Sequence, residues 1–158
     1  MTTIDLSEYR PNVGIIIINK EDQVWVGERA DIPGAWQMPQ GGMEDGESIK
    51  ETAYKELKEE TGINATEVTY IGETAVWSCY DFPGTPKEGR GEKWKGQKQR
   101  FVLFYFKGKP KNINLHKATD KEFSRWKWQG WQDVVAEAAD FRKPIYKKAF
   151  AFFDQHFK

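Results

Sequence analysis

The stretch between Gly41 and Ile63 constrains the fold most, because it predicts one helix held between two loops. Ser48 is followed three residues later by Glu51, the pattern of a capping box, in which each side chain accepts a hydrogen bond from the backbone N–H of the other residue. Gly62 suits the left-handed backbone conformation that ends many helices. We therefore expect a loop, a helix over residues 48–61 and a second loop.

The charged residues of this helix are unevenly distributed around its axis. At about 100° per residue, an apolar stripe runs through Ile49, Ala53 and Leu57 and would face a protein core. The acidic residues beside this stripe are Glu56, Glu59 and Glu60. The outer face would hold the remaining charged residues, Glu47, Glu51, Lys55 and Lys58. Of these, Glu51 and Lys55 have the spacing of a solvated i,i+4 ion pair.

Two interpretations of the inward acidic face follow from the helix alone. Charge runs on helices are most often solvated surface, which needs no ligand. Carboxylates gathered at the edge of a core, however, repel one another unless a positive charge lies among them. A hard divalent cation would supply that charge, because it prefers oxygen ligands. The pattern is therefore that of either an exposed helix or a metal site.

The spacing of this stretch resembles the signature of the Nudix hydrolases, G-x5-E-x7-R-E-U-x-E-E-x-G-U, where U is a bulky aliphatic residue. The positions in register are Gly41, Glu47, Glu56, Leu57, Glu59, Glu60, Gly62 and Ile63. Lys55 replaces the arginine of the signature, so it keeps the charge but lacks the planar group that binds a carboxylate through two N–H donors. The resemblance implies an α/β fold, namely an α/β/α sandwich with a mixed sheet, and a metal-dependent hydrolase.

Length and charge restrict the class of protein further. A chain of 158 residues is long enough for one well-buried domain, so we expect a single domain over residues 1–158. The formal net charge is zero while 30% of the residues are charged, which argues against a disordered tail and against a broadly basic protein that wraps DNA. One segment is locally basic, with Arg90, Lys93, Lys95, Lys98 and Arg100 against Glu92 alone. A basic rim beside a metal-filled acidic site suits a polyanionic substrate.

Cysteine content and hydropathy bear on the compartment. Cys79 is the single cysteine, which excludes an intramolecular disulfide and a zinc site built from cysteines. The first ten residues lack the basic and apolar regions of a secretory signal, and no apolar run approaches the length of a membrane span. We therefore expect a soluble, cytoplasmic protein without a membrane partner.

The remaining segments predict strands followed by helices. An unbroken apolar run, Val13–Ile18, indicates a strand covered on both faces, and a second strand should follow residues 20–22. Further strand-like segments cover residues 67–82, 96–108 and 122–131, the second of them with an exposed first half that carries Gln97 and Gln99 on one side and Lys98 and Arg100 on the other. Helices are expected over residues 131–139 and 143–157, the last with Pro144 in its first turn and an apolar stripe that includes Phe152 and Phe153.

Four blocks outside the signature narrow the resemblance. YRPNVGI, WQMPQGG, GQKQRF and EFSRWKW are similar to blocks of bacterial RNA 5′-pyrophosphohydrolases and of the related dinucleoside polyphosphate hydrolases, over Tyr9 to about Phe150. The resemblance implies that a 5′-triphosphate is held by Arg10, Arg29, Gln97, Gln99 and Arg100, with Tyr80 nearby. It also implies that Phe141 stacks on the first base, with Arg142 beside it. A core position for Phe141 is the alternative, but the polar break ADFRKP favours an exposed ring.

The resemblance further implies the metal site and the reaction. Two or more Mg²⁺ ions, or Mn²⁺ in their place, would be bound by the carbonyl of Gln40 and by Glu56, Glu59, Glu60 and Glu122, with Glu47 and Lys55 orienting the carboxylates. Water would attack the 5′-triphosphate of RNA, release pyrophosphate and leave a 5′-monophosphate, the step that initiates RNA decay. Each of the four glutamates is a candidate general base. The alternatives are a hydrolase of dinucleoside polyphosphates such as diadenosine tetraphosphate, and a Nudix module that binds nucleotides without cleaving them.

Overall fold

Two long strands form the centre of the molecule in the computed structural model, which describes residues 5–82 and 94–157. Strands β1 (Tyr9–Ile18) and β7 (Gly96–Phe106) pair in parallel through ten residue pairs. Residues 13–18 of β1 are all buried, which confirms the prediction of a strand covered on both faces. Part of the basic segment, Arg90, Glu92 and Lys93, lies outside the described residues.

The described residues contribute eight strands to one sheet. Its main order is β3-β2-β1-β7-β5, which adds β2 (Val24–Arg29), β3 (Trp36–Gln37) and β5 (Val68–Glu73). Three further strands pair outside this order: β4 (Gln40–Gly42) with β1, β6 (Ser78–Asp81) with β7, and β8 (Phe123–Gln129) with β2. Since these pairs are antiparallel and β1–β7 is parallel, the sheet is mixed, as predicted.

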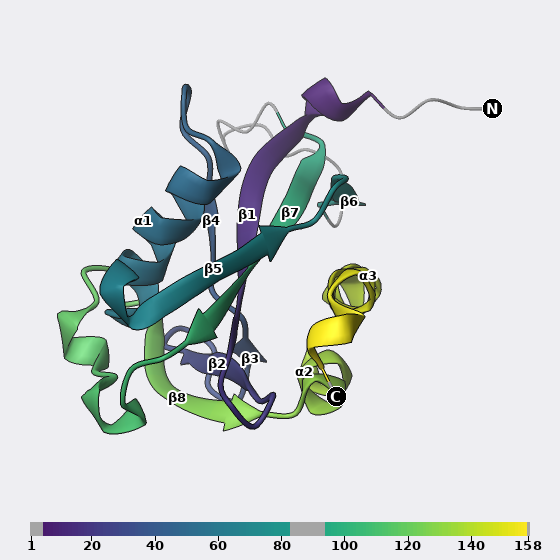
Figure 1. Cartoon of the computed structure of the whole chain (residues 1–158). Coiled ribbons are helices and arrows are strands. Elements are labelled where there is room, and N and C mark those ends of the chain that lie inside the picture. The colour runs from purple at the N-terminus through teal and green to yellow at the C-terminus, as the bar shows by residue number, and fades with distance from the viewer. Residues whose placement is uncertain (1–4, 83–93, 158) are drawn as a thin grey trace.

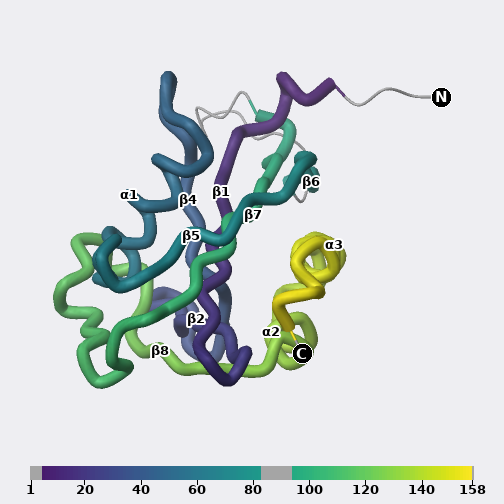
Figure 2. The backbone as a smooth tube through the Cα atoms, viewed as in Figure 1, coloured from purple at the N-terminus to yellow at the C-terminus, as the bar shows by residue number. Residues whose placement is uncertain are grey.

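Helices cover both faces of this sheet, which completes the expected α/β/α arrangement. Helix α1 (Ile49–Thr61) lies on one face, and α2 (Trp131–Glu137) and α3 (Lys143–Phe152) lie on the other (Figures 1 and 2). Short 3₁₀ helices occur at Leu6–Glu8, Ala65–Glu67, Pro110–Asn112, Leu115–Lys117, Asp140–Arg142 and Asp154–His156. In the part of the chain that the structure describes, each helix is too short or too polar to span a membrane.

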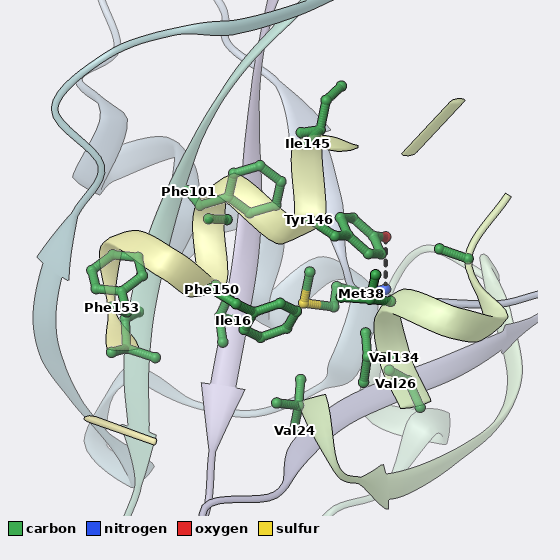
Figure 3. Close-up of a cluster of buried hydrophobic side chains, with 14 of the residues drawn as sticks. Ile16, Val24, Val26, Met38, Phe101, Val134, Ile145, Tyr146, Phe150 and Phe153 are labelled. Carbon is green, nitrogen blue, oxygen red and sulfur yellow. Dashed lines mark hydrogen bonds between the residues drawn. The ribbon is translucent and has the colours of Figure 1, made fainter. Parts of the chain in front are cut away.

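Alternation along β1 divides the buried side chains into two cores. Ile15 and Ile17 pack with Leu57 of α1, whereas Ile16 packs on the opposite face with α2 and α3, because successive side chains of a strand point to opposite sides. In the core under α2 and α3, the hydroxyl of Tyr146 accepts a hydrogen bond of 3.3 Å from the backbone N–H of Met38 (Figure 3). Helix α3 is therefore joined to the segment that leads into β4.

The caps of α1 agree with the sequence prediction. Ser48 and Glu51 form both hydrogen bonds of the capping box, and Gly62 ends the helix with a φ of 77°. Local chemistry alone therefore defines the helix that carries the acidic residues.

Three predictions about the limits or exposure of strands and helices differ from the structure. The strand-like segment over residues 67–82 is split into β5 and β6, because residues 74–77 lie opposite only residues 100–101 of β7 and the longer stretch bends out of the sheet at residues 75–76. The last helix ends at Phe152 rather than at 157, and Phe152 is half exposed while Tyr146 and Phe150 are buried. The first half of β7 is not exposed on both sides, since Gln97 and Gln99 are buried.

Candidate active site

Two glutamates of α1 point into the protein next to β4. Glu56 and Glu60 are one helical turn apart and both are buried. Glu60 Oε1 accepts a hydrogen bond of 3.1 Å from the backbone N–H of Gln40. A Cβ atom on Gly41 would lie 1.9 Å from the carboxyl carbon of Glu56, so only glycine allows β4 to approach this side chain so closely.

A third carboxylate, Asp120, comes from the segment before β8. Glu56, Glu60 and Asp120 each place one carboxylate oxygen within 4.8 Å of the others. The backbone N–H of Asp120 donates to the carbonyl of Glu59 with a length of 2.9 Å, which fixes this segment against the end of α1. Asp120 was not among the site residues predicted from the sequence. Its only signal was its place two residues before Glu122, in a short acidic segment.

Lys55 pairs with the loop that precedes α1. Its Nζ lies 2.9 Å from Glu47 Oε2, whereas the Glu51 carboxylate accepts from the backbone of Ser48 in the capping box. The expected Glu51–Lys55 pair is therefore wrong, because Glu51 is committed to the helix cap. Glu47 also accepts hydrogen bonds from the N–H of Glu44 and the hydroxyl of Thr52. Lys55 and Glu47 thus tie the loop to the helix behind the acidic residues, and neither belongs to a freely solvated face.

The side chain of Gln40 reaches the opposite face of the sheet. Its Oε1 accepts hydrogen bonds from Gln99 Nε2 at 2.8 Å and from Arg142 Nη1 at 2.6 Å. Gln99 Nε2 also donates to Asn12 at 2.8 Å, and only 1% of Gln99 is exposed. On the same side of β7, Gln97 accepts from the hydroxyl of Tyr80. Gln97 and Gln99 therefore lie within a buried polar network rather than on an open surface.

The three arginines that were expected to hold phosphate occupy different places. Arg10 is exposed next to β4, where a Cβ on Gly42 would lie 2.9 Å from its Nη2. Arg29 forms two hydrogen bonds, of 2.9 and 2.7 Å, with Asp31. Arg100 donates to the carbonyl of Thr74 at 2.8 Å and lies 3.3 Å from Glu73, so it is held at the turn between β5 and β6.

A pocket lies on the face of the sheet that carries α2 and α3. It has a volume of about 360 Å³, and its walls include Arg29, Trp36, Glu137, Phe141 and Arg142. Phe141 is 45% exposed, which excludes the core position considered for it. Its ring centroid lies 5.0 Å from that of Tyr80 and 5.0 Å from the guanidinium carbon of Arg142. The structure thus brings Arg29, Phe141 and Arg142 together around one cavity.

Comparison with known proteins identifies the family. The model of the NUDIX domain matches residues 8–149, most of the chain. This chain belongs to the Nudix family. It is 42% identical to Nudix hydrolase 25 of Arabidopsis thaliana over 152 residues, which cover 92% of this chain and 86% of the relative. It is 40% identical to the RNA pyrophosphohydrolase of Wolbachia pipientis subsp. Culex pipiens over 153 residues, which cover 96% and 93%. We conclude that it is a Nudix pyrophosphohydrolase.

Solved structures agree with the Nudix fold. The Ap4A hydrolase of C. elegans, in a binary complex, superposes with a TM-score of 0.67 at 20% identity, covering 92% of this chain and 98% of that chain. The dihydroneopterin triphosphate pyrophosphohydrolase of E. coli gives a TM-score of 0.67 at 17% identity, with coverage of 89% and 95%. At these identities the likeness concerns the arrangement of sheet and helices.

The electrostatics of the Nudix helix fit a divalent cation, the kind of cofactor that Nudix enzymes use. Burial raises the pKa of Glu60 to about 9, although the N–H of Gln40 opposes the shift, and the charges of Glu56, Glu122 and Asp120 add to it. Burial also raises the pKa of Glu56 to about 7, with a further contribution from Glu59. Buried carboxylates with such pKa values need a proton or a cation at neutral pH. Oxygen donors at this spacing suit a hard cation.

Glu59 and Glu122, the other two predicted ligands, lie outside the 4.8 Å set and are half-buried. Their charges nevertheless act on Glu56 and Glu60, respectively. Among the described carboxylates the compact set is therefore Glu56, Glu60 and Asp120, and these two glutamates border it.

Proposed function

We propose that this Nudix enzyme hydrolyses the 5′-triphosphate end of RNA to a 5′-monophosphate and releases pyrophosphate. The observation that carries the proposal is the exposed Phe141 ring in a pocket that Gln40 joins to the acidic cluster. Single-stranded RNA is commonly bound by stacking of its unpaired bases on aromatic rings. The identity of about 40% with an RNA pyrophosphohydrolase over nearly the full length of both chains supports the same substrate.

The acidic cluster would hold the metal. Glu56, Glu60 and Asp120 offer converging oxygens, and Glu59, Glu122 and the carbonyl of Gln40 are further candidate ligands. Two or more Mg²⁺ ions, or Mn²⁺, would neutralise phosphate charge and lower the pKa of a bound water. The chain's own contribution is to fix the carboxylates: Gln40 N–H holds Glu60, and the backbone of Asp120 is fixed to Glu59.

Arginine side chains would neutralise the rest of the triphosphate. Arg29 lines the pocket, and it is paired with Phe123, which directly follows Glu122. Arg29 therefore lies between the pocket and the acidic segment that contains Asp120. Its partner Asp31 is largely exposed, so a phosphate can replace this carboxylate without leaving a buried charge unpaired. Arg10 is exposed beside β4, where its guanidinium is accessible to a phosphate group.

The test is to compare kcat/KM of the purified enzyme with Mg²⁺ on triphosphorylated RNA, diadenosine tetraphosphate, ADP-ribose and a dNTP. Triphosphorylated RNA should be the best substrate. Phe141→Ala should lower kcat/KM on RNA by about tenfold, mainly through KM, because stacking contributes equally before and during the reaction. Phe152→Ala, which removes an equally exposed phenylalanine on α3, is the matched control. Equal or higher kcat/KM on diadenosine tetraphosphate would instead assign the enzyme to dinucleoside polyphosphates.

A further inference from the structure

Two cations of β8 gather over the ring of Trp36 at the edge of the Phe141 pocket. Lys127 Nζ lies 4.2 Å from the ring centroid, and the guanidinium carbon of Arg125 lies 5.4 Å from it. Trp36 lines the pocket, and so does Glu137, whose Oε2 is 3.8 Å from Lys127 Nζ. Because Lys127 contacts two residues of the pocket wall, it lies at the pocket's rim.

The course of β8 gives this rim a direction. Phe123, at the start of β8, is opposite Arg29, and it follows the acidic segment that contains Asp120 and Glu122. Lys127 is opposite Val26, which belongs to the core under α2 and α3. At roughly 3.3 Å per residue, Lys127 lies about 13 Å further along the strand than Phe123. The acidic segment comes first along β8, Arg125 follows level with the pocket residue Trp36, and Lys127 lies beyond both.

Both cations can accept a new anionic partner. The Lys127–Glu137 pair is long and both side chains are well exposed, at 39% and 48%, so it contributes little. Arg125 uses Nε and Nη2 to bind Glu28, at 2.8 and 3.0 Å, while its side chain stays 68% exposed. Among the described residues no hydrogen-bond partner of Arg125 Nη1 is found, so that edge of the guanidinium faces outward.

We propose that Lys127, with Arg125 beside it, binds the phosphate that follows the first nucleotide of the RNA. This inference rests on the proposed function, which places the 5′-triphosphate at the acidic cluster and the first base on Phe141. The RNA strand must then leave the pocket on the side away from the cluster. Lys127 lies on that side, and Arg125 lies beside it at the pocket wall. A free nucleotide and a dinucleoside polyphosphate have no phosphate on the 3′ side of this base. The site would therefore distinguish RNA from both.

Binding of reaction products tests this site without any turnover. We would titrate 5′-monophosphorylated RNAs of one, two and three nucleotides at fixed Mg²⁺ and follow fluorescence anisotropy. Lys127→Ala should weaken binding of the two longer RNAs by about fivefold and leave the mononucleotide unchanged, and it should reduce the slope of log K against log salt by about 0.7. Lys127→Arg should restore both quantities.

Lys50→Ala is the matched control, because Lys50 Nζ lies 4.5 Å from the ring of Tyr70 and its loss removes the same charge from a similar contact on α1. This variant should bind all three RNAs as the wild type does. An equal loss for the mononucleotide in Lys127→Ala, or an equal loss in Lys50→Ala, would overturn the assignment.

Kinetics separate this inference from the proposed function. If triphosphorylated RNA is hydrolysed but Lys127→Ala has no effect that depends on length, the inference alone is wrong. If the longer products bind in a Lys127-dependent way but triphosphorylated RNA is not hydrolysed, the proposed function is wrong and the binding site stands.

Discussion

The side chain of Glu60 is buried, has a raised pKa and accepts a backbone hydrogen bond, so the effect of replacing it can be predicted closely. Glu60→Gln keeps an oxygen that can accept from Gln40 N–H but removes the charge that a cation needs. We expect kcat to fall by about a thousandfold, the effect of losing several kcal/mol of charge stabilisation. Glu56→Gln should behave in the same way. Glu51→Gln, on the exposed face of the same helix, preserves the capping box and should be fully active.

Thermal denaturation in a chelator distinguishes a metal ligand from a structural residue. The metal-free Glu60→Gln protein should have the same or a higher Tm than wild type, since the substitution removes a buried carboxyl surrounded by other acids. A large drop in the metal-free Tm, or retention of more than about a tenth of kcat, would contradict the assignment.

Lys55 stands where the Nudix signature has arginine, and its contacts indicate how this replacement affects the site. Its ammonium group pairs with Glu47, whose carboxylate also accepts hydrogen bonds from Glu44 N–H and Thr52 Oγ1. We expect Lys55→Arg to be neutral or more active, because arginine can bind the same carboxylate through two N–H groups. Lys55→Ala should lower metal affinity and kcat while changing Tm by no more than about 3 °C, as for other half-exposed ion pairs. Isothermal titration with Mn²⁺ and steady-state kinetics would measure both effects. A strongly inactive Lys55→Arg would mean that the loop needs lysine geometry.

At the scale of elements, the close approach of β4 to α1 determines where the carboxylates lie. Gly41→Ala would place a Cβ 1.9 Å from the Glu56 carboxyl carbon, and the two elements would have to separate. We expect this variant to lose most of its metal affinity and at least about tenfold in kcat, since a displacement near 1 Å can cost more than that. Gly130→Ala is the control, because its new Cβ would meet its nearest neighbour at 3.7 Å, an ordinary contact. Similar Mn²⁺ affinities for both variants would show that the close approach is not required.

The elements also show which features local sequence can predict. The limits of α1 follow from Ser48, Glu51 and Gly62, whose hydrogen bonds stay within a few residues. The inward direction of Glu56 and Glu60 follows from helical periodicity. Asp120 could not be predicted in this way, because its place depends on a hydrogen bond to Glu59, sixty-one positions earlier in the chain. Trp36 and Lys127 are likewise far apart in the sequence. They come into contact because β3 and β8 both pair with β2.

Across the whole molecule, β4 connects the two faces of the sheet. The backbone of Gln40 holds Glu60 on the α1 face, and its side chain holds Arg142 on the face that carries α3. The sequence indicated Gln40 only through its carbonyl, since nothing in the WQMPQGG block reveals what the side chain contacts. The bridge depends on the packing of α3, which places Tyr146 against Met38 and the preceding residue Arg142 against Gln40. The Phe141 pocket and the acidic cluster are therefore both linked to one residue, Gln40.

The stability of the metal-free protein should depend on pH through the acidic cluster. The folded-state pKa values of Glu56 and Glu60, about 7 and about 9, exceed the value of 4.5 for a solvated glutamate. Between pH 4.5 and 9 the folded state therefore binds more protons than the unfolded state, and the free energy of unfolding falls as pH rises. One such proton changes it by about 1.4 kcal/mol per pH unit, or about 4 kcal/mol between pH 5.5 and 8.5.

We expect the Tm in EDTA to drop by about 10 °C over this interval. The lowered pKa values of Glu28, Glu47 and Asp31 act below it, and the raised pKa values of Tyr9 and Lys55 act above it. The double variant Glu56→Gln/Glu60→Gln should flatten the profile. Saturating Mg²⁺ should raise the wild-type Tm most at pH 8.5, where Glu56 is ionised and Glu60 releases its proton to the solvent most easily. A metal-free Tm that rises with pH would mean that Glu56 and Glu60 are stabilised as carboxylates in the fold even without a cation.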